Sequence, residues 1–266
     1  KNKKVYVINM FKTEYKNNPT TIEVNSIMSL HNVGEYEDAL IKCKDLFIKY
    51  PNSPLLYNIL GAINSGKCDF TNAIYSYLYA IKIKPNYAQA FNNLGILLKK
   101  LGEFNLAIIS YVKAINLKSD YIEAYNNIGL IYIETNEIQK SKFFFDKAFK
   151  IDANNETSNF NLGIVYSKQK KLCKAEFHFK EAIKINPTYI EAYYNLGMLY
   201  HNQEKIALAK RYYEKTLKLD PSFCEAHHIL NALSGKTTKS APKKYVEKLF
   251  DNYAANFEKS LVINLK

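Results

Sequence analysis

Apolar residues recur along this chain at intervals of three and four, in short segments separated by polar breaks. Residues 123–133 and 139–151 each carry one apolar stripe, and Asn136 and Glu137 form the polar break between them. A stripe at this spacing covers one face of an α-helix. The pattern therefore predicts pairs of antiparallel helices joined by tight turns, and an all-α fold.

The same pair of segments repeats every 34 residues. Its clearest mark is the tripeptide Asn-Leu/Ile-Gly, which ends at Gly95, Gly129, Gly163 and Gly197. We expect the small residues to let the two helices of a pair approach closely, and the aromatic residues to fill the gap to the next pair. Because no unit buries its own faces, stability must come from stacked neighbours. The other columns are small (Ala39, Ala73, Ala107, Ser141, Ala175, Ala209), aromatic (Tyr77, Tyr111, Phe145, Phe179, Tyr213) and proline (Pro51, Pro85, Pro187, Pro221).

These columns resemble the fingerprint of the tetratricopeptide repeat (TPR), in which an aromatic residue, Leu-Gly, Tyr, Ala, an aromatic residue, Ala and Pro stand at fixed offsets. The resemblance implies a right-handed solenoid of antiparallel helix pairs. Glu23 and Ile27 depart most from it, as expected of a terminal unit that faces water. The predicted organisation is an N-terminal segment or cap (1–19), six repeats (20–53, 54–87, 88–121, 122–155, 156–189, 190–223), a capping helix (224–235) that ends at Gly235, and a tail (236–266).

The resemblance also implies that the first helix of each repeat lines a concave groove, in which extended peptides bind. The candidate ligands there are an asparagine column and an apolar strip three residues further on. An asparagine amide can donate to and accept from a peptide backbone, and the column resembles the asparagine ladder of O-linked N-acetylglucosamine transferases. The alternatives are that the asparagines bond the neighbouring helix and that the strip is helix core. The candidates are Asn25, Asn93, Asn127, Asn161, Asn195 and the preceding Asn92 and Asn126, with Ile96, Leu130, Ile164 and Met198.

Composition narrows the function further. The net charge of +12 comes almost wholly from scattered lysines, and Arg211 is the only arginine. Since nucleic-acid readers depend on arginine, we expect a protein or extended peptide as the partner and no nucleic acid. No apolar run reaches the roughly 18 residues of a membrane span, so no membrane partner is expected. The four cysteines lie far apart along the chain, which favours a reduced, cytoplasmic location.

Motifs for catalysis and metal binding are missing from the sequence. Residues 234–237 read Ser-Gly-Lys-Thr, but the glycine that a phosphate-binding loop needs five positions before Gly235 is Leu230. His227 and His228 are adjacent and point to different faces of a helix, so they cannot share a metal ion. We therefore predict no catalytic residue and no metal site within these 266 residues.

The tail gives a second resemblance. The segment from Ala241 to Val262 is similar to the junction in bacterial proteins that join TPRs to an S-adenosylmethionine-dependent methyltransferase domain. It implies that this chain is the recruiting part of such an enzyme, with S-adenosylmethionine bound by a domain beyond Lys266. The alternatives are a helix that seals the end of the solenoid, a stand-alone adaptor, or the TPR array of a glycosyl- or sulfotransferase.

Overall fold

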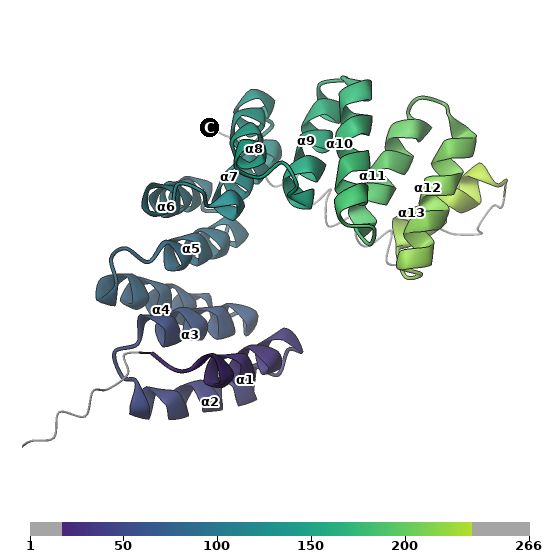
Figure 1. The fold of residues 1–266 in the computed structure, drawn as a ribbon. Coiled ribbons are helices and arrows are strands. Elements are labelled where there is room, and N and C mark those ends of the chain that lie inside the picture. The colour runs from purple at the N-terminus through teal and green to yellow at the C-terminus, as the bar shows by residue number, and fades with distance from the viewer. Residues whose placement is uncertain (1–17, 236–266) are drawn as a thin grey trace, which may run out of the picture. The chain divides into compact units, whose positions relative to one another are not determined.

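The computed structural model describes residues 18–235, which form thirteen α-helices and no strand, so the predicted all-α fold is confirmed (Figure 1). The tail and most of the N-terminal segment lie outside the described residues. The first helices of the pairs are α1 (Thr21–Asn32), α3 (Pro54–Gly66), α5 (Ala88–Lys100), α7 (Ile122–Glu134), α9 (Glu156–Lys168) and α11 (Ile190–His201), followed by α13 (Cys224–Leu233). The second helices are α2 (Tyr36–Lys49), α4 (Phe70–Ile83), α6 (Phe104–Leu117), α8 (Ile138–Ile151), α10 (Leu172–Ile185) and α12 (Ile206–Leu219).

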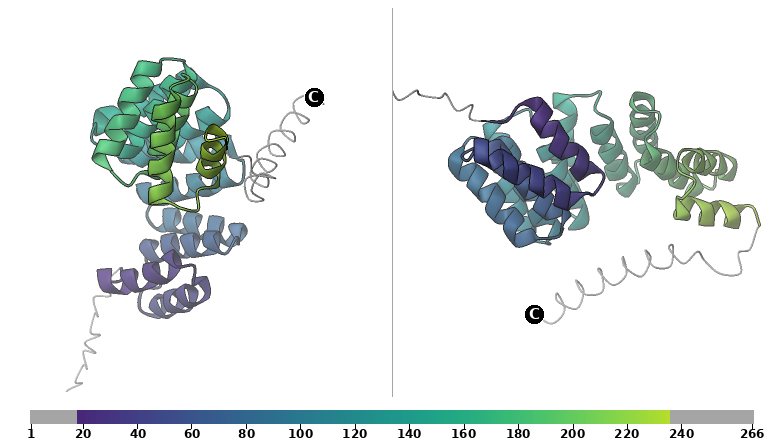
Figure 2. Two further views of the ribbon diagram at one scale, coloured as in Figure 1. Left: turned by 90° about the vertical axis from the view of Figure 1, so that its right-hand side faces the viewer. Right: turned by 90° about the horizontal axis from the view of Figure 1, so that it is seen from below.

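The chain divides within α7 into two compact units, residues 1–128 and 129–266. In unit 1, α3 packs on α4 and α4 on α5; in unit 2, α9 packs on α10 and α10 on α11 (Figure 2). Within each unit these helices thus lie against their neighbours along the chain, which is the local stacking expected of a repeat protein.

The glycine and aromatic columns meet inside each helix pair. A Cβ atom added at Gly61 would lie 2.5 Å from the ring of Tyr77, and one at Gly163 would lie 2.5 Å from the ring of Phe179. A Cβ atom would meet the ring in the same way in the three other repeats that carry both a glycine and an aromatic residue: Gly95 with Tyr111, Gly129 with Phe145, and Gly197 with Tyr213. Each ring lies over the glycine of its own pair, because only glycine leaves room for it. Tyr77 also belongs to one buried cluster with Leu94 and Leu97 of the next pair, in agreement with the expectation that these rings fill the gap between pairs.

The turn between the two helices of a pair has the same left-handed backbone in all six repeats. Gly34 and Gly102 adopt it with φ of +84° and +79°. In the other four repeats the same position is held by residues with a Cβ atom, for which this conformation is unfavourable. Those residues are Cys68, Asn136, Lys170 and Glu204, with φ between 57° and 62°.

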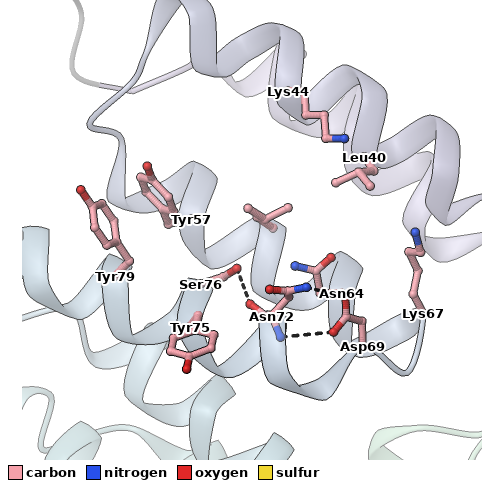
Figure 3. A pocket seen from close by; sticks show the side chains of 11 residues that line it. Leu40, Lys44, Tyr57, Asn64, Lys67, Asp69, Asn72, Tyr75, Ser76 and Tyr79 are labelled. Atoms are coloured by element: carbon pink, nitrogen blue, oxygen red, sulfur yellow. Dashed lines mark hydrogen bonds between the residues drawn. The ribbon is translucent and has the colours of Figure 1, made fainter.

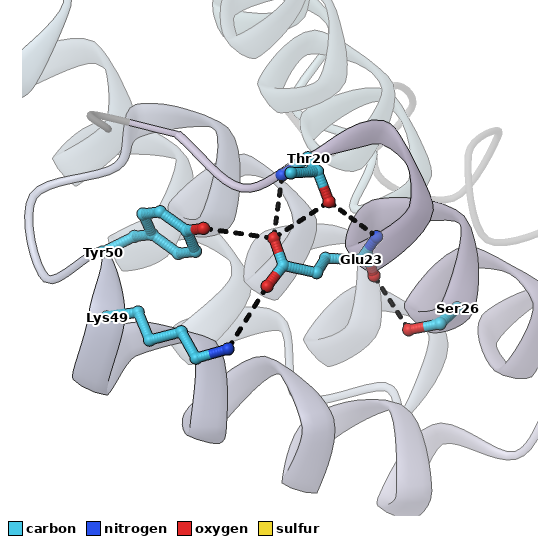
Figure 4. Close-up of polar contacts among 5 residues, drawn as sticks. All are labelled: Thr20, Glu23, Ser26, Lys49 and Tyr50. Carbon is cyan, nitrogen blue, oxygen red and sulfur yellow. Dashed lines mark hydrogen bonds and ion pairs between the residues drawn. The ribbon is translucent and has the colours of Figure 1, made fainter. Parts of the chain in front are cut away.

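The departure at Glu23 in the first repeat has a structural reason. Glu23 faces the end of α2, and its carboxylate accepts hydrogen bonds from the Thr20 backbone N–H (2.9 Å) and the Tyr50 hydroxyl (3.2 Å) (Figure 4). Its backbone N–H donates to the Thr20 hydroxyl in return, which completes a capping box. Lys49 adds an ion pair at 3.4 Å. A polar cluster thus surrounds Glu23, at the position where the next two repeats carry the aromatic residues Tyr57 and Phe91.

Candidate functional site

The first helices approach one another more closely than the second helices do. In unit 1, α3 contacts α5, and in unit 2, α9 contacts α11; within residues 18–235 no two second helices make contacts of that extent. In each unit the first helices therefore lie on the inner side of the stack. The asparagine column and the apolar strip both belong to these helices.

In unit 1 the asparagines form hydrogen bonds between successive repeats. The Asn93 amide nitrogen donates to the Asn58 side-chain oxygen at 3.0 Å, and the Asn127 amide nitrogen donates to the Asn92 side-chain oxygen at 3.3 Å. Both acceptors are buried, at 4% and 5% exposed, whereas Asn93 and Asn127 are half-buried. Each donor amide retains a second hydrogen and its own oxygen for another partner.

Asn58 is a member of this network that the candidate set did not include. The available signal was the position directly before the asparagine column, where Asn58 precedes Asn92 and Asn126 at intervals of 34. The amide ladder of unit 1 therefore consists of pairs, one buried acceptor and one half-buried donor from the next repeat.

In unit 2 aromatic rings replace the buried asparagines. Phe160 packs against Tyr189 with ring centroids 5.0 Å apart, and Tyr194 packs against Phe223 at 4.9 Å. Asn195, directly after Tyr194, turns its amide nitrogen to the Glu191 carbonyl oxygen of its own helix, at 2.8 Å. Asn195 thus bonds within its own helix, unlike Asn93 and Asn127.

Burial divides the remaining candidates. Asn92, Asn126 and Asn161 are only 5%, 4% and 2% exposed, so they are corrected from ligand-facing residues to residues packed between helices. Asn25 is exposed, and in the apolar strip Ile96 and Met198 are 48% and 37% exposed. The two other members of the strip, Leu130 and Ile164, pack against the core of unit 2. The residues best placed for a ligand are Asn25, Asn93, Asn127, Asn195, Ile96 and Met198.

The titration behaviour of the described residues follows burial. Burial raises the pKa of the Cys43 thiol to about 12, and it raises the pKa of the Tyr189 hydroxyl to about 12. Cys43 is fully buried, whereas Tyr189 is half-buried. Within residues 18–235, no cluster of histidine, cysteine or acidic side chains could hold a metal ion, and no helix is long and apolar enough to cross a bilayer.

Comparison with known families identifies the repeats. Models described as tetratricopeptide repeat match residues 122–155, 157–189 and 190–223. A model described as TPR repeat matches residues 69–102, 97–136 and 175–204. Together these matches cover more than half of the chain. None of the curated proteins compared with the sequence matches it.

Solved structures share the fold. A chain of the APC/C hetero-tetramer Cut9-Hcn1 superposes with a TM-score of 0.69 at 17% identity, covering 83% of this chain but only 44% of that one. MamA is 26% identical with a TM-score of 0.53, over 62% of this chain and 97% of its own. YrrB, described as a TPR protein with an unusual peptide-binding site, has a TM-score of 0.52 at 16% identity, over 70% and 96% of the two chains.

Proposed function

This chain belongs to the tetratricopeptide repeat family, whose members serve as protein-binding scaffolds, and we propose that it holds an extended peptide against the first helices of unit 1. The observation that carries the proposal is the pair of half-buried amides at Asn93 and Asn127. Each is fixed by one hydrogen bond to the preceding repeat and keeps a donor and an acceptor for a ligand backbone. Fixing a side chain in advance lowers the entropy lost on binding.

The apolar strip supplies the second element of the site. Ile96 lies one turn after Asn93 on α5, so the two side chains share a face of the helix. Its side chain is 48% exposed. An extended peptide can therefore hydrogen-bond the amides through its backbone and place an apolar side chain on Ile96. Such a site selects weakly for sequence, because the amides contact groups that every peptide has.

The test compares the same substitution on the two sides of unit 1. Peptides selected from a random display library on the full chain are measured against Ile96→Asp and against Ile109→Asp, since Ile109 on α6 is similarly exposed at 57%. Ile96→Asp should weaken the selected peptides about tenfold or more, and Ile109→Asp should leave them unchanged. Equal effects of the two variants, with circular dichroism showing both folded, would refute the proposed site.

A narrower role rests on the tail sequence alone. We propose that this scaffold recruits substrates for an S-adenosylmethionine-dependent methyltransferase, because the segment from Ala241 to Val262 resembles the junction to such a domain. That segment lies outside the described residues. Calorimetry of S-adenosylmethionine with this chain and with a polypeptide extended beyond Lys266 tests the role. Binding only by the longer form supports it, and binding by neither favours a stand-alone adaptor or another transferase.

A cytoplasmic location and the exclusion of nucleic-acid and membrane partners stay predictions. The location rests on the widely spaced cysteines, and the exclusion of nucleic acid rests on the scattered lysines and the single arginine. The exclusion of a membrane partner rests on the lack of a long apolar run in the sequence.

A further inference from the structure

A pocket of about 410 Å³ opens between α2, α3 and α4 in unit 1 (Figure 3). Tyr57 and Tyr79 line one end of it, and Asn64 and Lys67 line the other, while Lys44 reaches over it from α2. This α2–α4 pocket involves two second helices, so it is separate from the first-helix face that carries the asparagine amides of α5 and α7.

The pocket exists because two repeat columns lose their large side chains in the second repeat. In each of the three repeats that pair α7 with α8, α9 with α10 and α11 with α12, a tyrosine on the first helix stacks on an aromatic ring of the second. Asn64 and Ser76 occupy these two columns in the second repeat, and their smaller side chains leave the space open. The stacked pairs are Tyr132–Phe144 (5.6 Å), Tyr166–His178 (5.3 Å) and Tyr200–Tyr212 (5.4 Å).

Asn64 and Lys44 are polar residues of the pocket whose side chains have no hydrogen bond or ion pair within residues 18–235. The Asn64 side chain is 8% exposed and forms no hydrogen bond there, although it offers two donors and an acceptor. Lys44 forms no ion pair among the same residues. The Asn64 amide lines the open pocket, so its donors and acceptor are available to a ligand that enters there.

The other charged groups of the pocket are already paired. Lys67 forms an ion pair with Glu37 at 2.6 Å. The Asp69 carboxylate accepts from the Asn72 side-chain nitrogen at 2.7 Å and from its backbone N–H at 3.2 Å. The hydrogen bonds to Asn72 hold the pKa of Asp69 below its usual value, so its charge is retained and already stabilised. Lys44 is therefore the group with charge to offer a ligand.

The remaining wall is aromatic. Tyr57 and Tyr79 lie with ring centroids 4.5 Å apart. Leu40 and Tyr75, the latter 67% exposed, add further apolar surface to the lining. Exposed apolar side chains beside a concave site are typical of a surface that binds another protein.

We propose that the α2–α4 pocket is a second peptide-binding site, which takes an acidic segment carrying one large apolar side chain. The apolar side chain packs against Tyr57 and Tyr79, a neighbouring carboxylate pairs with Lys44, and a backbone peptide group bonds the Asn64 amide. The peptide group is the natural match for Asn64, because it presents a donor and an acceptor together. The net charge of +12 attracts an acidic partner from a distance.

The probe is an acetylated nine-residue peptide with Phe at its centre. Glu occupies the position directly before the Phe and the position directly after it, and Ser occupies the rest. Its binding to the full chain is followed by nuclear magnetic resonance through the Asn64 side-chain amide signals. Saturable shifts of these signals are expected. They should be lost when the Phe of the peptide is replaced by Ala, and also when its Glu residues are replaced by Lys. An unshifted Asn64 amide at saturating peptide would overturn the proposal.

Matched variants of the chain separate this site from other surfaces. Lys44→Glu should weaken the peptide about tenfold, whereas Lys42→Glu, which makes the same charge change outside the pocket, should not. Asn64→Tyr with Ser76→Tyr places in the pocket the tyrosine pair that the α11–α12 repeat has at Tyr200 and Tyr212, and it should abolish binding. Ser110→Tyr in the next repeat should not. If Lys44→Glu and Lys42→Glu weaken the peptide equally, the attraction is non-specific and the pocket is not the site. Ile96→Asp tests the first-helix site alone, so the two proposals fail separately.

Discussion

Replacing Gly163 by Ala tests whether the aromatic column determines the glycine column. The added Cβ would lie 2.5 Å from two ring carbons of Phe179, well inside van der Waals contact. Phe179 is 1% exposed and has little room to move. Overpacking of this kind costs about 1–3 kcal/mol, while Ala gains about 1 kcal/mol over Gly in a helix interior. We expect a net loss of up to about 2 kcal/mol in the free energy of unfolding.

The Phe179→Ala background isolates the cause. Without the ring the Cβ has space, so Gly163→Ala should there stabilise the chain by about 1 kcal/mol through helix propensity. The sign of the effect thus reverses, and the coupling between the two positions equals the overpacking cost of about 1–3 kcal/mol. Gly197→Ala should cost less than Gly163→Ala, because its Cβ would lie 2.9 Å from the nearest ring carbon of Tyr213.

Urea denaturation followed by circular dichroism measures these differences. Because repeat proteins can unfold in parts, hydrogen exchange of the α9 and α10 amides should accompany it. If Gly163→Ala were equally destabilising with and without the Phe179 ring, the ring would not be the reason for the glycine, and the packing argument would be wrong.

Three further predictions follow from burial and backbone conformation. Burial lowers the pKa of His178 from 6.5, so the folded chain should lose stability as the pH falls below that value, and His178→Tyr should flatten the dependence measured by urea denaturation between pH 5 and 7. Lys170→Gly should raise the free energy of unfolding by about 0.5–1 kcal/mol, because Lys170 has φ of +57°. An unchanged urea midpoint would show that the turn is not strained. Ellman's reagent should label the exposed Cys68 and Cys173 in the folded chain and the buried Cys43 only after unfolding, and rapid labelling of Cys43 in buffer would contradict its burial.

The periodic columns were sufficient to predict the helices closely. The stripe predicted over 139–151 corresponds to α8, Ile138–Ile151, and the one over 123–133 corresponds to α7, Ile122–Glu134. Helix ends are this close because the polar break and the left-handed turn at Asn136 recur with the repeat. A single helix pair read without its neighbours would have given less certain boundaries.

The asparagine column could not be assigned from the sequence in the same way. The residue type is consistent with a bond to a ligand and with a bond to the next helix, and the choice depends on how closely successive first helices approach. Asn93 and Asn127 combine the two roles, since each donates one hydrogen to the preceding repeat and remains half-buried. Asn161 shares their column but is only 2% exposed, so the same residue type has different surroundings in different repeats.

The direction of the aromatic rings shows a similar limit. Spacing alone places Phe179 and Gly163 in fixed columns, and it predicts contact with the next pair, but it does not show that the ring also lies over the glycine of its own pair. The structure resolves this through the backbone: the space beside a helical glycine is large enough for a ring edge, and the ring enters it.

The α2–α4 pocket shows where function can vary within such a fold. The glycine, alanine and aromatic columns are buried in every repeat that carries them, so packing leaves them little freedom. The two columns that hold Tyr166 and His178 in one repeat hold Asn64 and Ser76 in another, and both repeats form the same helix pair. Because the fold accepts a stacked pair or an open space there, these columns are free to be shaped by a ligand. Binding sites in this chain are therefore best sought where a repeat departs from its neighbours, rather than where the repeats agree.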